Sequence, residues 1–353
     1  MTDFEQWLAH PVKKINQQFL DQALARQQQL TKPAGSLGQL ENVATKLAGL
    51  QGTAHPRVDY VQITIFAADH GIVEEGVSAF PQAVTAEMIR NFSRGGAAIS
   101  VLAEETDSDL SVINMGTVAE LEQLEHVEDE RISAGTANFL HQAAMTMQQC
   151  QQAMNVARFY IDEVKESGKQ LFIGGEMGIG NTSSATAIAC ALLNRPAAEL
   201  VGPGTGLDQS AVQHKANIID QALAQHQSQL TSPLTILQYL GGFEIAALTA
   251  SYLQCAKLGL PMLIDGFISS VAALVAQRIN PDCQHWFLFS HCSAEPGHQY
   301  VLAELKAEPL LNIGMRLGEG SGAAVALALL KLSCSLHNDM ATFAEATVSE
   351  KSS

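Results

Sequence analysis

The apolar positions along the chain fall into two repeating patterns. Short runs rich in β-branched residues predict strands, and longer stretches with apolar residues every three or four positions predict amphipathic helices. The predicted strands cover 58–68, 110–115, 170–174, 261–264 and 286–290. The predicted helices among them cover 39–52, 82–94, 97–105, 136–167, 183–193, 208–226, 233–239, 241–257, 267–277 and 300–306. Because strands and helices alternate from residue 58 to residue 330, we expect an α/β fold with a doubly wound, mainly parallel sheet flanked by helices.

Helical spacing also marks both ends of the chain. Residues 1–30 show it on either side of Pro11, which divides the stretch into two helices, and a last helix runs from residue 323 to about residue 343. Neither end has strands of its own, so we expect the two ends to pack together as a small helical satellite. The predicted division is N-terminal helices at 1–57, an α/β domain at 58–330, and a C-terminal helix with a frayed tail at 331–353.

The charge balance excludes several classes of partner. Against 20 Lys and Arg residues stand 36 Asp and Glu residues, a formal net charge of −16, which argues against nucleic acid and against an anionic membrane surface. The longest apolar stretch, 258–276, is interrupted by Asp265, so we expect no membrane span. The N-terminus lacks signal-peptide features and the six cysteines form no C-x-x-C pair, which favours a cytoplasmic protein with reduced thiols.

One carboxylate stands between two glycines directly before a long apolar run. The segment is RLGEGSGAA at 316–324, with Glu319 between Gly318 and Gly320. An apolar helix behind this acid would hold it in a water-poor place, where a carboxylate becomes a better base. The alternative is a loop glutamate that the dipole of the following helix stabilises.

Two glycine-rich loops indicate anion binding. The first, GGEMGIGNT at 174–182, joins a predicted strand to a predicted helix, and this arrangement directs backbone N–H groups at an anion. A plain turn between strand and helix is the alternative. The second, VGPGTG at 201–206, precedes a predicted helix that carries Lys215. This lysine is a candidate phosphate ligand, and an ordinary surface lysine is the other interpretation.

Asp69 and His70 follow the first predicted strand directly. Polar groups at the carboxyl end of a buried strand lie where open α/β sheets bind ligands, although an aspartate there also caps turns. Both interpretations stay open.

A further cluster follows the last predicted strand. His291, Glu295 and His298 have the spacing H-x3-E-x2-H, and such side chains suit zinc, but Pro296 and the glycine after it would interrupt a helix there. A loop that presents Ser293 to an anion is the favoured alternative. Cysteine chemistry is only weakly indicated, by Cys292 beside the first histidine.

Six motifs in one order cover about residues 30–330: KPAGSLG at 32–38, ADHGI at 68–72, GEMGIGNT at 175–182, DGFI at 265–268, HCSAEPGH at 291–298 and RLGEGSG at 316–322. Together they resemble the nicotinate-nucleotide–dimethylbenzimidazole phosphoribosyltransferase family of cobalamin synthesis. The resemblance implies nicotinate mononucleotide as donor and 5,6-dimethylbenzimidazole as acceptor, with α-ribazole 5′-phosphate and nicotinate as products. It also implies a homodimer that needs no metal or organic cofactor, and a nucleotide-binding catalytic role for the α/β domain.

The resemblance also assigns roles to residues. Glu319 matches the family's general base. The positions that match nucleotide and phosphate ligands are Glu176, Gly178, Gly180, Asn181, Gly202, Gly204, Lys215 and Ser293. The positions that match the pocket for the acceptor base are Phe80, Gln82, Glu87, Met88 and Leu317.

Three classes of function are open before the resemblance is used. They are phosphoribosyl transfer, metal-dependent hydrolysis of a phosphorylated small molecule, and nucleotide binding without chemistry. The first uses the two loops and one base, and the second uses the histidine cluster. The six motifs favour the first.

Overall fold

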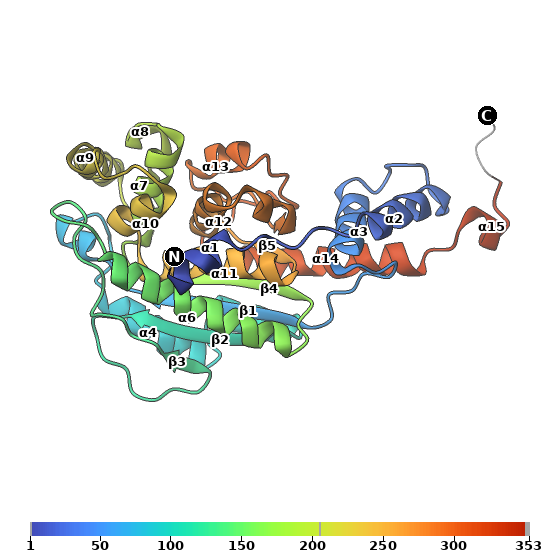
Figure 1. The fold of residues 1–353 in the computed structure, drawn as a ribbon, viewed down its shortest axis with the longest axis horizontal. Coiled ribbons are helices and arrows are strands. Elements are labelled where there is room, and N and C mark those ends of the chain that lie inside the picture. The colour runs from blue at the N-terminus through green and yellow to red at the C-terminus, as the bar shows by residue number, and fades with distance from the viewer. Residues whose placement is uncertain (1, 205, 350–353) are drawn as a thin grey trace.

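The computed structural model describes residues 2–204 and 206–349, and a six-stranded parallel sheet forms the centre of this described part (Figure 1). Its order is β3-β2-β1-β4-β5-β6. The strands are β1 (Val61–Ala68), β2 (Asp109–Gly116), β3 (Val127–Asp129), β4 (Leu171–Met177), β5 (Met262–Ile264) and β6 (Phe287–Phe289). The direction in which the strands are added reverses between β1 and β4, which is the point where doubly wound sheets bind their ligands. The predicted fold class is confirmed.

Helices cover both faces of the sheet, as Figure 1 shows. They are α1 (Asp3–Ala9), α2 (Gln17–Gln29), α3 (Gln39–Gln51), α4 (Ala83–Ser93), α5 (Ala98–Glu105), α6 (Met147–Glu166), α7 (Asn181–Leu193), α8 (Ala197–Leu200), α9 (Gln209–His226), α10 (Pro233–Leu240), α11 (Phe243–Leu258), α12 (Phe267–Ile279), α13 (His298–Glu304), α14 (Ser321–Asp339) and α15 (Phe343–Ala346). Two short 3₁₀ helices, Gly71–Glu75 and Pro281–Trp286, complete the described elements. None of the described helices combines the length and the apolar character that a membrane span needs.

The central strands are apolar along their whole length because both of their faces are covered. All eight residues of β1 are buried, and alternate residues join opposite cores. Ile63 and Ile65 pack with α3, α4, α5 and α14, whereas Phe66 packs with α6, α11 and α12. A strand that is buried on both faces appears in the sequence as a continuous apolar run, and this run is what predicted β1.

The register of β1 and β4 places their carboxyl ends side by side. Phe66 pairs with Glu176, and Ala67 pairs with Met177. The residues that follow β1, Asp69 and His70, therefore lie beside the glycine-rich loop that follows β4.

The structure differs from the predicted elements at two places. The helix expected at 136–167 begins at Met147, where Thr146 forms a capping box with Gln149. The residues before it bond elsewhere, and the backbone N–H of Thr136 donates to the carbonyl of Asp69. The strand β3 is not among the predicted strands; it lies in an acidic stretch, and its backbone pairs with β2 at the edge of the sheet.

The outlying end of the molecule contains α2, α3 and the second half of α14 (Figure 1). Arg26 of α2 donates to the carbonyls of His337, Asn338 and Met340 at the end of α14. By contrast, α1 lies on α11, where Trp7 donates to the side chain of Gln254.

The predicted domain limits at 57 and 330 stay predictions. The second limit falls inside α14, which is continuous. The predicted tail, 344–353, includes most of α15, and its last four residues lie outside the described part.

Candidate active site

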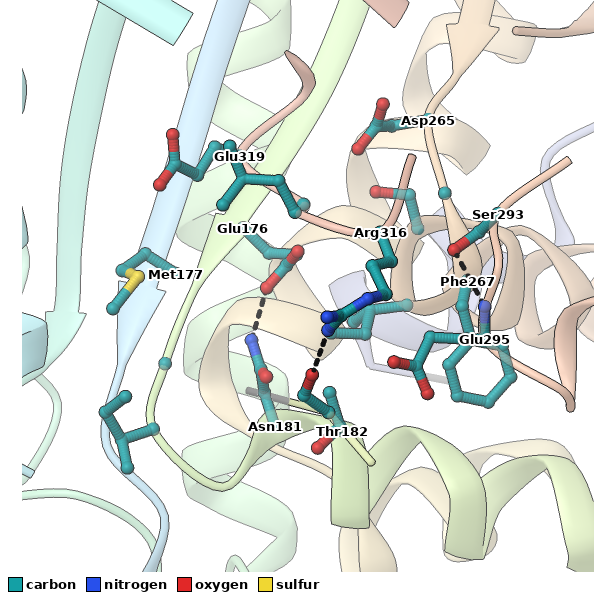
Figure 2. Close-up of a pocket in the computed structure, with 18 of the residues that line it drawn as sticks. Glu176, Met177, Asn181, Thr182, Asp265, Phe267, Ser293, Glu295, Arg316 and Glu319 are labelled. Carbon is teal, nitrogen blue, oxygen red and sulfur yellow. Dashed lines mark hydrogen bonds between the residues drawn. The ribbon is translucent and has the colours of Figure 1, made fainter. Parts of the chain in front are cut away.

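A cavity of about 520 Å³ opens at the carboxyl ends of β4, β5 and β6. Among the residues predicted to form the site, those that line it are Phe80, Glu176, Gly178, Asn181, Gly204, Ser293, Leu317 and Glu319. Figure 2 shows Glu176 and Glu319 on the side of β4, with Ser293 and Glu295 across the cavity and Arg316 between them. Loops that are far apart in the sequence therefore meet at one edge of the sheet.

Glu319 is held in a buried and constrained position. Its backbone is left-handed, with φ of 64°, and only 5% of the residue is exposed. Burial raises the pKa of its carboxyl to about 7, a hydrogen bond from the Ile99 backbone opposes the rise, and the charge of Asp265 adds to it. No hydrogen-bond partner reaches its Oε2 among the described residues. A carboxylate with one free oxygen and a pKa near neutrality is suited to accept a proton.

Glycine lets the Glu319 loop lie directly on the sheet. A Cβ at Gly175 of β4 would stand 2.6 Å from the carbonyl oxygen of Glu319 and 2.9 Å from the nitrogen of Gly320. These are backbone atoms and cannot rotate away. The first glycine-rich loop therefore positions the acid as well as any anion.

Glu176 is the second buried acid. It is the second-last residue of β4 and accepts a hydrogen bond from the Asn181 side chain. Burial raises its pKa well above the ordinary value, and the charges of Asp265, Glu244 and Glu319 raise it further. The protonated form of Glu176, whose carboxyl can donate a hydrogen bond, is thereby favoured relative to an exposed glutamate.

Asp265, directly after β5, joins the same group of acids. Its carboxylate accepts the backbone N–H of Ala323, in the first turn of α14, at 2.8 Å. Burial raises its pKa, and His291, whose Nδ1 lies 3.8 Å from it, opposes that shift. Asp265 thus holds the start of α14 and, through it, Glu319.

The lower side of the cavity in Figure 2 carries the donors that suit an anion. The N-terminus of α7 begins at Asn181, and the positive end of the helix dipole there favours negative charge. Lys215, 1% exposed, donates from Nζ to the hydroxyl of Thr182 at 2.8 Å. Burial lowers its pKa to about 8 and Glu295 opposes this. Lys215 lies behind the cavity wall, so its charge acts through Thr182.

Arg316 and the loop at 202–204 close that side. The guanidinium of Arg316 donates a hydrogen bond to the carbonyl of Gly204 at 2.9 Å. Glu295 lies close to both Arg316 and Lys215, whose positive charges oppose the rise in pKa that burial causes in its carboxyl.

Six predicted site residues do not line the cavity: Gly180, Gly202, Lys215, Gln82, Glu87 and Met88. The two glycines serve close packing instead. A Cβ at Gly180 would lie 3.0 Å from the Cβ of His70, and one at Gly202 would collide with the carboxyl of Glu295. The assigned roles of all predicted residues stay predictions.

Within the histidine cluster, His298 has a structural role, whereas His291 and Glu295 line the cavity. The Nδ1 of His298 accepts the backbone N–H of Ser293 at 2.8 Å, and its Nε2 lies 2.9 Å from the hydroxyl of Ser270. Burial lowers the pKa of His298 to about 3. Both ring nitrogens are therefore engaged, and within the described ranges no three His, Cys, Asp or Glu side chains are placed to hold a metal ion.

Sequence reasoning gave no role to several residues that line the cavity, among them Met177, Thr182, Asp265, Phe267, Glu295 as a lining acid, and Arg316. A signal existed for all six, because each lies in one of the six motifs. The clearest are Asp265, which opens the DGFI motif after a predicted strand, and Arg316, which opens the motif that contains Glu319. Asp69 and His70 do not line the cavity and are fully buried.

Comparison with known proteins agrees with this geometry. A family model described as Phosphoribosyltransferase matches residues 12–348. The nicotinate-nucleotide–dimethylbenzimidazole phosphoribosyltransferase of Pseudomonas putida strain KT2440 is 57% identical over 345 residues, covering 98% of each chain. The enzyme of that name from Pseudomonas fluorescens is 56% identical over 351 residues, covering 99% of each.

A solved structure gives the same result. The crystal structure of the enzyme of that name from Thermus thermophilus superposes with a TM-score of 0.90 at 38% identity, over 96% of this chain and 100% of that one. The fold, the order of the motifs and the full-length relatives agree. The chain belongs to the nicotinate-nucleotide–dimethylbenzimidazole phosphoribosyltransferase family.

Proposed function

We propose that the protein transfers the 5-phosphoribosyl group from nicotinate mononucleotide to 5,6-dimethylbenzimidazole, giving α-ribazole 5′-phosphate and nicotinate. The relatives are named for these two substrates. The observation that carries the proposal is the carboxyl of Glu319, buried in the wall of the cavity that the anion-binding loops also line, with a pKa of about 7.

The donor's phosphate lies at the N-terminus of α7 and the loop of Gly204. Lys215, through Thr182, and Arg316 supply positive charge there, and Ser293 supplies a hydroxyl. In a protein of net charge −16, this local group of cations is what allows an anionic substrate to bind. Fixing the phosphate also fixes the ribose, and such positioning can supply roughly 7–11 kcal/mol in favourable cases.

The departing nicotinate needs no acid. It is attached to C1′ as a pyridinium ion, so the C–N bond breaks to leave a neutral ring nitrogen. Glu176, whose pKa burial raises, therefore need not supply a proton to the leaving group and is free to act as a hydrogen-bonding group. The same carboxyl is suited to hold a ribose hydroxyl.

The acceptor attacks through one ring nitrogen while the other carries a proton. As the new C–N bond forms, that N–H becomes strongly acidic, and Glu319 accepts the proton. Conversion of a β-linked donor to an α-linked product requires inversion at C1′, so the acceptor and Glu319 lie on the face opposite the nicotinate. The ionised Glu319 also offsets the positive charge that develops on the ribose.

The resemblance further implies a homodimer, and the sequence favours a cytoplasmic location. Light scattering on the purified protein would test the first. Localisation of the tagged protein in its cell would test the second. We also expect that the reaction needs no metal or organic cofactor.

The direct test is incubation with both substrates and detection of nicotinate and α-ribazole 5′-phosphate by mass spectrometry. Formation of both products, with full rate after exhaustive chelation, is the expected result. Release of phosphate alone, or loss of activity on chelation, would instead favour a metal-dependent hydrolase. Tight nucleotide binding without turnover would favour a binding module.

A further inference from the structure

We propose that Thr85 is a positioning residue that fixes the acceptor relative to the donor. The inference rests on the proposed function and concerns two segments. The acceptor segment, residues 80–88, carries most of the predicted pocket for the base and includes the start of α4. The donor loop, residues 178–182, carries the predicted nucleotide contacts. Thr85 joins them.

The Thr85 hydroxyl makes two bonds in opposite directions. It donates to Oδ1 of Asp69 at 2.6 Å and accepts the backbone N–H of Ile179 at 3.1 Å. Ile179 lines the cavity within the donor loop, whereas Thr85 lies on α4, five residues after Phe80, which lines the same cavity. One fully buried side chain therefore bridges the two substrate regions.

Asp69 and His70 form the fixed point to which this bridge is attached. They follow β1, the strand at the reversal point of the sheet. The second oxygen of Asp69 accepts the backbone N–H of Val118 at 2.8 Å. The carbonyl of His70 accepts the Gln82 side chain at 2.9 Å, a second link to the acceptor segment.

The imidazole of His70 provides the link on the donor side. Its Nδ1 lies 2.9 Å from the hydroxyl of Ser184 on α7, and its Nε2 lies 2.6 Å from the carboxyl of Glu244 on α11. All three side chains are fully buried, so the ring has no freedom to turn. The donor loop lies against this dipeptide without a side chain between them, because Gly180 leaves no Cβ to separate it from His70.

The geometry of the reaction explains why a rigid connection between the two segments matters. Attack at C1′ requires the acceptor nitrogen roughly 3–3.5 Å from the carbon and in line with the departing bond. Each substrate has its own binding groups, so affinity alone does not set the distance between them. A rigid connection between the two segments does.

The test compares Thr85→Val with Thr85→Ser. Valine keeps the shape of threonine and removes the hydroxyl, while serine keeps the hydroxyl and loses a methyl group. We expect Thr85→Val to bind each substrate alone within about threefold of the natural protein, measured by calorimetry. Its single-turnover rate should fall roughly 10- to 100-fold, and Thr85→Ser should retain most of the rate.

Thr249→Val is the matched control. Thr249 is also fully buried, but its hydroxyl donates to the carbonyl of Ile245 on its own helix at 2.8 Å, with a longer contact of 3.4 Å to the carbonyl of Ala272 on α12. Thermal unfolding of this control measures how much stability is lost with a buried hydroxyl away from the site. Its turnover rate should be unchanged.

An unchanged single-turnover rate in Thr85→Val would overturn the inference. So would a loss of rate matched by an equal loss of donor affinity, because that pattern means a damaged binding loop. If Thr85→Val does not fold, the single-turnover rate of Thr85→Ser is compared with that of Thr249→Ser. A larger loss of rate in Thr85→Ser would overturn the inference, because it would show that the methyl group, not the hydroxyl, fixes the two segments. Absence of product from the natural protein would instead reject the proposed function.

Discussion

Glu319 combines three properties that are seldom found together in one residue: its side chain is acidic, it is buried, and its backbone is left-handed. A left-handed non-glycine residue costs of order 1 kcal/mol or more and persists only when its surroundings hold it. Gly175 beneath it and Asp265, which accepts a hydrogen bond from the first turn of α14, are those surroundings. We infer that this cost is tolerated because the carboxyl must reach the cavity.

Replacement of Glu319 by glutamine should remove the base and keep the shape. We expect turnover to fall roughly 10²–10⁴-fold, with little change in the KM for nicotinate mononucleotide, because the phosphate contacts are untouched. Steady-state kinetics with both substrates measures this. A variant with near-normal turnover would remove Glu319 from the mechanism.

The pH dependence of the reaction should report the same group. A base acts only when ionised, and the pKa of Glu319 is about 7, so kcat/KM should rise with pH up to about 7 and then level off. The Glu319→Gln variant should lack this rise. A natural enzyme whose rate is flat from pH 5.5 to 8 would contradict the assignment.

The stability of the protein should show the cost of ionising Glu319. Between its ordinary pKa of 4.5 and its folded pKa of about 7, the folded state keeps a proton that the unfolded state releases. The free energy of unfolding contributed by this group is thus fully present below pH 4.5 and is lost as pH rises to about 7.

At pH 8, Glu319→Gln should therefore be more stable than the natural protein, by about 1–3 kcal/mol. At pH 5 the difference should be smaller. Urea unfolding at both pH values measures it. A variant that is less stable at pH 8 would show that the carboxylate has a stabilising partner when ionised.

At the scale of elements, the sequence revealed most of what positions the site. Strands buried on both faces and glycines beside an acid have strong local signals. The segment 136–146 and the strand β3 have weak ones, because their conformation depends on partners distant in sequence. The backbone of the first bonds to Asp69 and to Tyr239, and β3 exists only through its pairing with β2.

The same limit applies to the site itself. The glycine-rich loops could be found by their composition, but the sequence could not tell which glycines face the ligand. Gly178 and Gly204 line the cavity, whereas Gly180 and Gly202 pack against His70 and Glu295. Such a distinction depends on which side of a turn the neighbouring chain occupies.

Gly175→Ala tests how β4 positions the base. The new methyl group would meet the backbone of Glu319 and Gly320 at 2.6 to 2.9 Å, so the loop must shift. We expect turnover to fall roughly tenfold to a hundredfold or more, because a shift of about 1 Å is costly in a positioned site.

Gly174→Ala is the control on the same strand. Its methyl group would meet the Leu248 and Tyr252 side chains on the opposite face of β4. It should lower stability, as overpacking of a core does, while the Glu319 loop keeps its place. Equal loss of turnover in both variants would mean that general damage to β4, not displacement of Glu319, explains the effect.

At the scale of the whole molecule, Arg26 links the outlying helix α2 to the end of α14. Arg26 donates to three carbonyls at the end of α14, and such carbonyls otherwise lack partners within the helix. Arg26→Met should lower the free energy of unfolding by about 1–3 kcal/mol, with kcat unchanged below the unfolding temperature.

Arg57→Met provides the comparison for that measurement. Arg57 forms an exposed ion pair with Asp59 at 3.6 Å, and pairs of this kind contribute little. Denaturant unfolding of both variants separates capping of α14 from the general loss of an arginine. If the two variants are equally stable, Arg26 does not secure α14.

The length of α14 has a consequence for the whole enzyme. Its 19 residues span about 28 Å at the rise of an α-helix. The helix begins two residues after Glu319 and ends where Arg26 donates hydrogen bonds to its last carbonyls. A helix of this length without a break transmits force with little bending. The residue proposed to accept the proton and the outlying helices α2 and α3 are therefore joined by one continuous element.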